Sequence, residues 1–330
     1  MKRFVKNVPV VRTVVCICVG LLLSACAARQ QGPTAPDPQS RWQPGRIIEV
    51  QSGKVLDLPV FLAQLTRYDI LYLGEEHYNQ HHIDAALTVI EAAIADRRPV
   101  ALAMEMFGWD GQSALNDFLS TPDSDRENFL DRAHWKQNWG GAFSNYEPLV
   151  RTARSYHLPL WAMNPPKPLI RQVVKLGLAE ARTGSDWAAW GMDREDIVDD
   201  QAYRSKILDQ LKRCHGGGSE DDYLRMYEAS LVRDEGMAKT VADAFRRMRQ
   251  GTTQAGLVIS YTGGGHIQYN LPVPKRVTRR VGTEATQTTI YLTSFDQSRL
   301  PDIQDLLRDS IADYLWLTPV SQQGLPQRCR

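Results

Sequence analysis

The sequence lacks the patterns that mark several common classes of protein. Its charges nearly cancel, with 39 Lys and Arg against 38 Asp and Glu, and it has no basic block that would suit nucleic acid and no acidic tail. No Cys-x-x-Cys pair is present, which argues against a zinc ribbon or a dithiol redox site. The G-x-G-x-x-G spacing and a phosphate-loop lysine are also missing, so we expect neither nucleotide nor nucleic-acid binding.

Long apolar runs are scarce, and the one at the N-terminus is too short to span a membrane. Residues 14–23 are about half of the roughly 20 residues that a spanning helix needs. A basic stretch precedes this run and Leu23-Ser24-Ala25-Cys26 follows it, which is the pattern of a secretory signal, here residues 1–25.

A cysteine at the cleavage site resembles a bacterial lipoprotein signal, in which that cysteine carries lipid. We therefore expect Cys26 to anchor the protein in the cell envelope, with Ala27 favouring the outer membrane and the chain facing the periplasm. An ordinary cleaved signal with an incidental cysteine is the alternative. Residues 26–45, rich in Gln, Pro and Ala, are predicted to be a flexible tether.

Few cysteines remain for other purposes. Once the signal and Cys26 are set aside, Cys214 and Cys329 are the two thiols left. In an oxidising periplasm they could form a disulfide that ties the C-terminal tail to the body of the protein. Two unpaired thiols are the alternative.

From residue 46 onward, short apolar strands alternate with helices. Such a pattern indicates an α/β fold with a mostly parallel sheet flanked by helices. We expect strands at 70–73, 100–104, 158–162, 256–261 and 288–292, the last of which closes or edges the sheet. The predicted helices are 79–96, one that begins near 110, and 147–156.

One long segment breaks this alternation and reads as helices only. We therefore assign residues 168–250 to an inserted, smaller all-helical subdomain, 46–167 and 251–300 to the α/β domain, and 301–330 to a C-terminal helix and tail. The last helix of the insertion has a stripe in which Asp234 is the one charged member. We expect Asp234 to pair with an arginine or a helix end, with a ligand-facing role as the alternative.

Polar side chains follow four of the predicted strands. Ligands of parallel sheets bind beyond the carboxyl ends of the strands, so these side chains should meet around one cavity. They are Glu75, Glu76 and His77 after the first strand, Glu105 after the second, Asn164 after the third, and His266, behind three glycines, after the fourth. On the helix that follows His77, we favour His82 over His81 as a ligand contact, because His82 borders the buried stripe.

Two kinds of chemistry suit this set of residues. His77, His266 and Glu105 could hold a divalent metal with an open position, while Glu75 or Glu76 serves as a base for water. Alternatively, the same polar edge could orient a bound cofactor without catalysis. The aromatic residues between 107 and 161 could line a pocket for a flat ligand, or they could form core.

Several segments together resemble the ChaN-type haem-binding lipoproteins of the haem-uptake, Tiki and TraB superfamily. The resemblance covers roughly residues 46–292 and is carried by residues 73–77 with 81–82, 104–107, 146–149, 161–164, 233–238, 264–266 and 271–274. It implies an α/β domain with a smaller helical domain, lipid anchoring at the outer membrane, and a role in haem and iron acquisition or storage.

The resemblance also implies haem in an apolar pocket, which two copies of the chain could share, with a tyrosine oxygen on the iron. Tyr146 is our first choice and Tyr269 the second, while Tyr223 and Tyr227 stay open. Candidates for contacts with the haem propionates are His77, His82, His266, Lys275 and Arg276.

The expected partners are haem and an outer-membrane haem receptor system. Other members of the superfamily resemble metal-dependent peptidases or esterases, in which His77, Glu105 and His266, with Glu75 and Glu76, would be catalytic and hold the metal. We expect binding rather than catalysis.

Overall fold

The computed structural model describes residues 41–121, 125–250 and 256–325. These residues belong to a single unit that spans residues 38–330. The predicted signal, Cys26 and most of the tether lie outside the described residues, and so does Cys329. Cys214 is disulfide-bonded. In the described part of the chain, no helix is both long enough and apolar enough to cross a membrane.

The described residues form an eight-stranded, mostly parallel sheet. Six neighbouring strands, from β8 to β5, run parallel, and β1 pairs antiparallel with both β8 and β2. The order across the sheet is β2 (Lys54–Leu56), β1 (Ile47–Glu49), β8 (Tyr314–Thr318), β7 (Gln287–Ser294), β3 (Ile70–Glu75), β6 (Leu257–Gly263), β4 (Val100–Gly108) and β5 (Leu160–Asn164).

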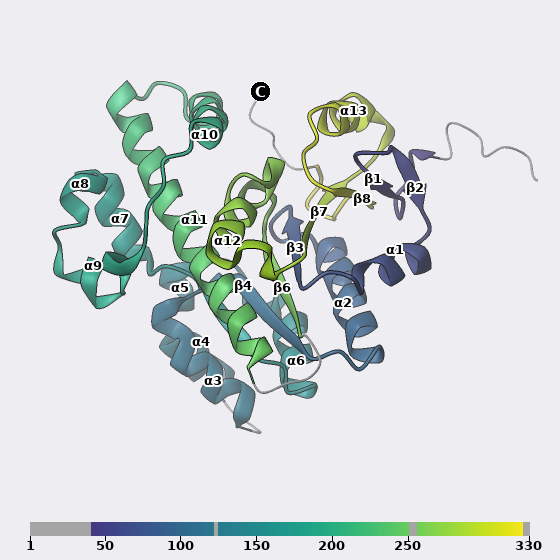
Figure 1. The fold of residues 1–330 in the computed structure, drawn as a ribbon, viewed down its shortest axis with the longest axis horizontal. Helices are drawn as coiled ribbons and strands as arrows, with labels where there is room; N and C mark the ends of the chain where they lie inside the picture. The colour runs from purple at the N-terminus through teal and green to yellow at the C-terminus, as the bar shows by residue number, and fades with distance from the viewer. Residues whose placement is uncertain (1–40, 122–124, 251–255, 326–330) are drawn as a thin grey trace, which may run out of the picture. The chain divides into compact units, whose positions relative to one another are not determined.

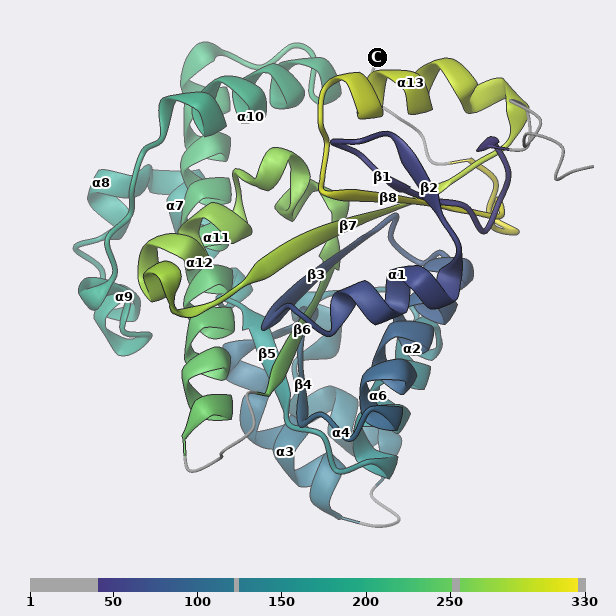
Figure 2. The ribbon, with the colours of Figure 1, turned by 45° about the vertical axis from the view of Figure 1, so that its right-hand side comes forward.

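Helices cover both faces of this sheet (Figures 1 and 2). One face packs against α1 (Leu58–Leu65), α2 (Gln80–Ala95), α3 (Gln112–Ser120), α4 (Arg126–Arg132), α5 (Trp135–Asn138) and α6 (Glu147–Ser155). The other packs against α11 (Glu220–Arg249), α12 (Val273–Val281) and α13 (Leu300–Arg308). Beyond α11 lie α7 (Lys167–Leu176), α8 (Leu178–Ala181), α9 (Ser185–Ala189) and α10 (Gln201–Cys214).

The predicted fold class is confirmed, and the structure differs from the sequence-based prediction in three places. The strand expected to close or edge the sheet, β7, lies inside it between β3 and β8. Two short strands, β1 and β2, were not predicted. Residues 301–330, expected as a helix and tail, contain β8 as well as α13.

The helical segment 168–250 contains α11, which packs directly on β4, β5 and β6.

The long helix α11 is well specified by its sequence. Its N-terminus has a capping box between Ser219 and Asp222, its first turn is acidic and its last turn is basic, which suits the helix dipole. Its middle approaches the sheet very closely at Gly236, because a Cβ atom there would overlap Pro165 and crowd Trp109. This close approach brings Arg233 and Asp234 to the carboxyl ends of β4 and β5.

The connections of the two central strands run in opposite directions. β3 and β6 pair side by side, yet the chain passes from β3 to β4 on one side and from β6 to β7 on the other. In α/β sheets, such a reversal leaves a crevice outside the carboxyl ends of the two strands, where ligands bind. Glu75 and Gly263 are register partners at this point.

We predict that Gly236→Ala destabilises the protein, although alanine is the better helix former by about 1 kcal/mol. The added methyl group would overlap the Pro165 ring, and such overpacking typically costs about 1–3 kcal/mol. Chemical denaturation measures the change. Gly216→Ala is the matched control, since its added Cβ would meet no atom within 4 Å. Equal stability of the Gly236 variant and the unmodified protein would contradict the close packing of α11.

Candidate functional site

The four strand ends meet around one cavity, as expected. The cavity has a volume of about 320 Å³, at the low end of the roughly 300–1,000 Å³ that is usual for ligand pockets. It opens between α11 on one face of the sheet and the segment around Trp139 on the other. Its lining residues are His77, Tyr78, Glu105, Asn138, Trp139, Asn164, Pro165, Lys167, Ile170, Arg233 and His266.

Glu105 is the centre of the α11 side of the cavity. Its side chain is 1% exposed, and its Oε1 accepts a hydrogen bond of 2.5 Å from Arg233 and lies 3.3 Å from Nε2 of His266. Its Oε2 accepts a bond of 2.6 Å from the backbone N–H of Gly263. Burial opposes ionisation, but the charges of His266 and Arg233 outweigh it and hold the pKa of Glu105 well below its usual range.

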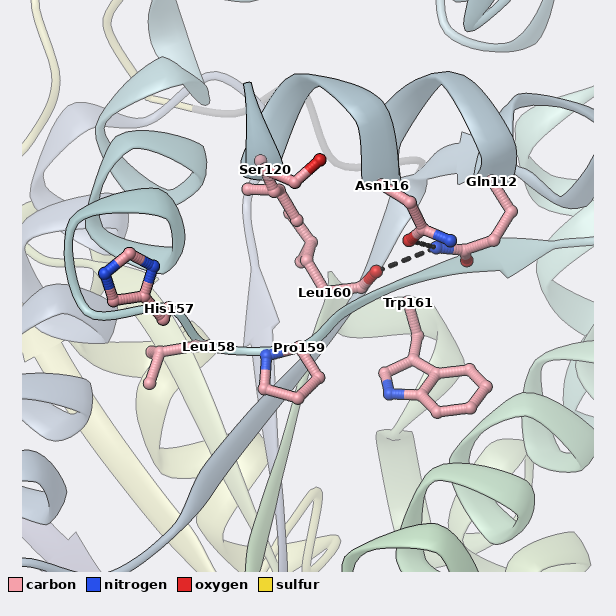
Figure 3. Close-up of a pocket in the computed structure, with 9 residues that line it drawn as sticks. Gln112, Asn116, Ser120, His157, Leu158, Pro159, Leu160 and Trp161 are labelled. Carbon is pink, nitrogen blue, oxygen red and sulfur yellow. Dashed lines mark hydrogen bonds between the residues drawn. The ribbon is translucent and has the colours of Figure 1, made fainter. Parts of the chain in front are cut away.

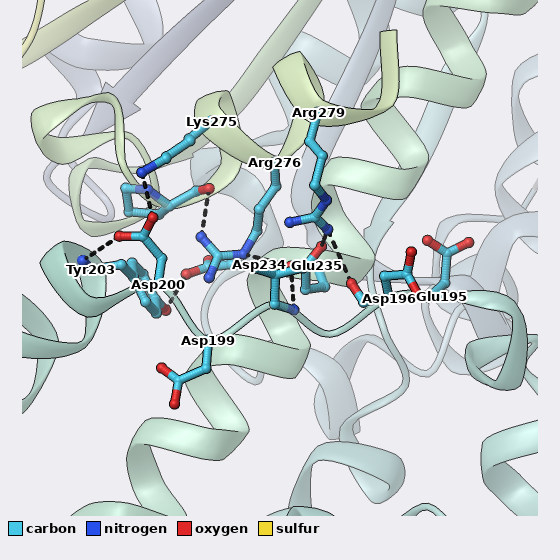
Figure 4. Close-up of polar contacts among 12 residues, drawn as sticks. Glu195, Asp196, Asp199, Asp200, Tyr203, Asp234, Glu235, Lys275, Arg276 and Arg279 are labelled. Atoms are coloured by element: carbon cyan, nitrogen blue, oxygen red, sulfur yellow. Dashed lines mark hydrogen bonds and ion pairs between the residues drawn. The ribbon is translucent and has the colours of Figure 1, made fainter. Parts of the chain in front are cut away.

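A second carboxylate holds His266 from behind. Oδ1 of Asp234 lies 2.6 Å from Nδ1 of His266, and its Oδ2 accepts a 2.5 Å bond from the hydroxyl of Tyr203. Figure 4 shows the contact between Asp234 and Tyr203 beside Arg276. The guanidinium carbon of Arg276 lies 4.1 Å from the centre of the Tyr203 ring. Asp234 is thus paired with a histidine and a tyrosine rather than with the arginine or helix end that the sequence predicted.

The other side of the cavity is organised by Glu75. This buried carboxylate accepts hydrogen bonds of 2.7 Å from the hydroxyls of Tyr146 and Tyr261, and it lies 2.8 Å from Nδ1 of His77. Burial raises the pKa of Glu75. The side chain of His77 is 41% exposed, and its Nε2 has no hydrogen-bond partner among the described residues. The imidazole therefore presents Nε2 to the cavity while Nδ1 is held from behind.

Tyr78 and Trp139 form an aromatic wall next to His77. The ring centres of His77 and Trp139 are 4.8 Å apart, and those of Tyr78 and Trp139 are 6.0 Å apart. Tyr78 has a φ of 65°, a strained value for a residue other than glycine, and such strain concentrates at functional sites. Its phenol lies over the backbone of Gly141, where any side chain would collide with it.

Several predicted ligand contacts do not line the cavity. Tyr146 is fully buried, and its hydroxyl both donates to Glu75 and accepts from the backbone N–H of Tyr78. Burial and the Glu75 charge raise the pKa of Tyr146, which disfavours a phenolate. Tyr269 lies outside the cavity too, with the Lys206 ammonium 4.2 Å from its ring centre.

His82 and Glu76 belong to a separate buried network. Nδ1 of His82 accepts from the backbone N–H of Glu76, and its Nε2 lies 2.9 Å from the hydroxyl of Thr318 in β8. Burial lowers the pKa of His82 to about 4. Glu76 accepts from Ser294 and Arg299. These two residues connect the β3 end to β7 and β8 and do not reach the cavity.

The remaining candidates are engaged elsewhere. Lys275 pairs with Asp200, and Arg276 is buried with its guanidinium donating to backbone carbonyls of residues 271 and 272. The hydroxyls of Tyr223 and Tyr227 donate to the His215 carbonyl and to Asp199. Most aromatic residues of segment 107–161 are core, and Trp139 is the one that lines the cavity.

The metal site that the sequence offered as an alternative does not form among the described residues. Among the described residues, no group of three or more His, Cys, Asp or Glu side chains could hold a metal ion. The physical reason is that Glu105 is already occupied by Arg233, His266 and a backbone N–H, while His266 is turned toward Asp234. A divalent cation at this point would also meet the charges of Arg233 and a protonated His266.

Other hollows lie away from the strand ends. The cavity in Figure 3 lies at the amino end of β5, between that edge strand and α3. There the Gln112 amide bonds the Leu160 carbonyl at 2.9 Å and the Ala162 N–H at 2.6 Å, as a neighbouring strand would. Gln112 thus covers the exposed edge of the sheet, which is a common protection against edge-to-edge pairing.

Comparison with known proteins places the chain in a family. The family model described as haem-binding uptake, Tiki superfamily, ChaN matches residues 61–277, which is more than half of the chain. The chain belongs to the ChaN family. No curated protein matches the sequence.

Solved structures resemble this chain to different degrees. A Campylobacter jejuni ChaN, described with cofacial haem binding, has a TM-score of 0.60 at 14% identity and covers 82% of this chain and 95% of its own. An erythromycin esterase variant in its open conformation has a TM-score of 0.42 at 15% identity and covers 77% of both chains. A succinoglycan biosynthesis protein has a TM-score of 0.41 at 14% identity, with coverage of 78% and 73%.

The sequence of this ChaN-family protein predicts only part of the cavity lining. Arg233 lies in a family-like segment and Trp139 is one of many aromatic residues, but no pattern marks either as a cavity residue. Tyr78, Asn138, Lys167 and Ile170 are further lining residues that the sequence did not predict. For Tyr78 the available signal was its position directly after His77 at a strand end, and for Lys167 it was its place three residues after Asn164.

We predict that stability falls as pH rises through the range in which His266 loses its proton. Burial would lower the pKa of His266, but Glu105 and Asp234 outweigh it and raise that pKa to about 9. The ordinary value is about 6.5, so the stabilisation is complete below pH 6.5 and is lost toward pH 9, by up to about 3 kcal/mol. Urea denaturation from pH 6 to 9.5 measures this slope.

His266→Gln should remove most of this pH dependence. His157→Asn is the control, because His157 is exposed before β5 and should leave the slope unchanged. If the unmodified protein were equally stable at pH 6.5 and 9, the ion pairs of His266 would not contribute to folding.

Proposed function

We propose that this ChaN-family protein binds ferric haem in the cavity at the carboxyl ends of β3, β4, β5 and β6. The single observation that carries the proposal is the pair of potential iron ligands in the lining, Tyr78 and His77. Among the described residues, neither the Tyr78 hydroxyl nor Nε2 of His77 has a hydrogen-bond partner. Family membership supports the same ligand.

The cavity also suits the shape of a porphyrin edge. Trp139 and Tyr78 offer flat apolar walls on one side, and Ile170 and Pro165 offer aliphatic surface on the other. Planar aromatic and aliphatic surfaces of this kind favour a large, flat, mostly apolar ligand. Haem would supply the iron, and the protein would supply an axial ligand and an apolar enclosure.

Of the two potential ligands, we propose that Tyr78 coordinates the iron. A phenolate suits ferric iron, as in other haem proteins with a tyrosine ligand. Burial and the charges of Glu75 and Glu105 raise the pKa of Tyr78, so the phenol is neutral until iron replaces its proton. Tyr146, our choice from the sequence, is the partner of Glu75 and instead supports His77 from behind.

The N-terminal sequence supports a place for this binding in the cell envelope. We propose that the protein is held by lipid on Cys26, at the outer membrane, where it takes up or stores haem with a receptor system. Two copies of the chain could face each other across the bound haem.

Tyr78→Phe should weaken ferric haem binding by about tenfold or more and shift the Soret band, because the axial oxygen is lost. Titration of the purified protein with ferric haem, followed by absorbance, measures both effects. Tyr223→Phe is the matched control, since it removes the same atom from a buried phenol that does not line the cavity. It should leave the spectrum unchanged and lower stability by about 1–3 kcal/mol, because the His215 carbonyl loses its donor.

Other results would reassign the ligand or overturn the proposal. An unchanged spectrum for Tyr78→Phe with a lost band for His77→Ala would place imidazole on the iron instead. A protein that shows no Soret band with ferric haem in any form would not be a haem-binding protein at this site.

Cys26→Ser should release the protein from the membrane fraction and abolish labelling by palmitate, because lipid chains at this residue supply the anchoring. Cys18→Ser, within the signal, should change neither result. Cell fractionation and metabolic labelling are the measurements. A Cys26→Ser protein that stays labelled and membrane-bound would rule out this anchor.

A further inference from the structure

The carboxylate and amide oxygens that line the cavity are already in use. One oxygen of Glu105 accepts from Arg233, and the other accepts from the backbone N–H of Gly263. The amide oxygen of Asn164 accepts a 2.9 Å bond from Arg233. The amide oxygen of Asn138 accepts from the backbone N–H of Lys167 at 3.4 Å.

One cation of the same cavity remains without an acceptor. The ammonium group of Lys167, which lines the cavity, has no hydrogen bond or ion pair with any described residue. A ligand that supplies an anionic acceptor there would therefore be favoured.

Positive charge also gathers at this end of the cavity. Burial lowers the pKa of Lys167, and the guanidinium groups of Arg171 and Arg233 lower it further. Arg233 neutralises Glu105, so the Lys167 charge has no counterpart of its own. An anion placed between Lys167 and Arg233 would relieve this repulsion and accept charge-assisted hydrogen bonds.

We infer that Lys167 and Arg233 form a carboxylate-binding end of the cavity, which receives a propionate of the bound porphyrin. This inference rests on the proposed haem binding. It replaces two of the five candidates from the sequence, Lys275 and Arg276, because both are engaged outside the cavity. The porphyrin would then be held at two points, by its iron at Tyr78 and by a carboxylate at Lys167.

The test compares ferric haem with its dimethyl ester, in which both propionates are uncharged, in the same detergent. The unmodified protein should bind the free acid about tenfold more tightly than the ester. Lys167→Met should lower the affinity for the free acid by about tenfold and leave the affinity for the ester unchanged. Metal-free protoporphyrin serves as a third ligand, because its carboxylates act without an iron bond.

Lys175→Met is the matched control. Lys175 is an exposed lysine on the same helix, about two turns from Lys167, and does not line the cavity. Its replacement should leave the acid-to-ester ratio within about twofold. Thermal unfolding of each variant confirms that the fold is kept.

The outcomes separate this inference from the proposed function. Equal affinity for acid and ester, or an equal effect of the Lys167 and Lys175 variants, would overturn the carboxylate site while haem binding stands. Displacement of haem by millimolar acetate or inorganic phosphate would identify a free anion, rather than a propionate, as the occupant and would also overturn it. Absence of binding for all three porphyrins would remove the proposed function itself.

Discussion

The fold and the site both depend on the buried carboxylate of Glu105. It joins elements that are far apart in the sequence, because Arg233 comes from α11 while His266 and Gly263 come from the end of β6. Removal of one partner from a buried ion pair typically costs about 3–5 kcal/mol, so the network binds these elements firmly together. With the close approach at Gly236, it holds α11 across the strand ends and leaves the cavity beside it.

The same network decides what the cavity can bind. Each oxygen of Glu105 and Asp234 is engaged by Arg233, His266, the Tyr203 hydroxyl or a backbone N–H, so these carboxylates are not available to a metal ion. Lys167, in contrast, keeps an unmatched positive charge. On the opposite side, Glu75 is held by two phenols and in turn orients His77. The cavity therefore combines an aromatic wall, two potential iron ligands and an excess of donors, which suits an anionic, flat cofactor better than a bare cation.

Sequence reasoning worked where a residue's place in the sheet decides its role. The apolar strands β3, β4, β5 and β6 were recognisable, and parallel topology brings His77, Glu105, Asn164 and His266 to one edge. It did not extend to β8, because Tyr314–Thr318 is a short run after a helix and its partners lie far back in the chain. The two antiparallel strands β1 and β2 have only three residues each, too few for a pattern.

By itself, the sequence determined the α/β class, the family and the strand ends that carry the chemistry, since these follow from local patterns and motifs. Only the tertiary structure decided which side chains face the cavity. Tyr146 and His82 lie in family-like motifs yet are buried against Glu75 and Thr318. Tyr78 belongs to no motif, yet it lines the cavity, with a positive φ of 65°. The direction of a side chain depends on contacts between distant segments, and no local pattern encodes those contacts.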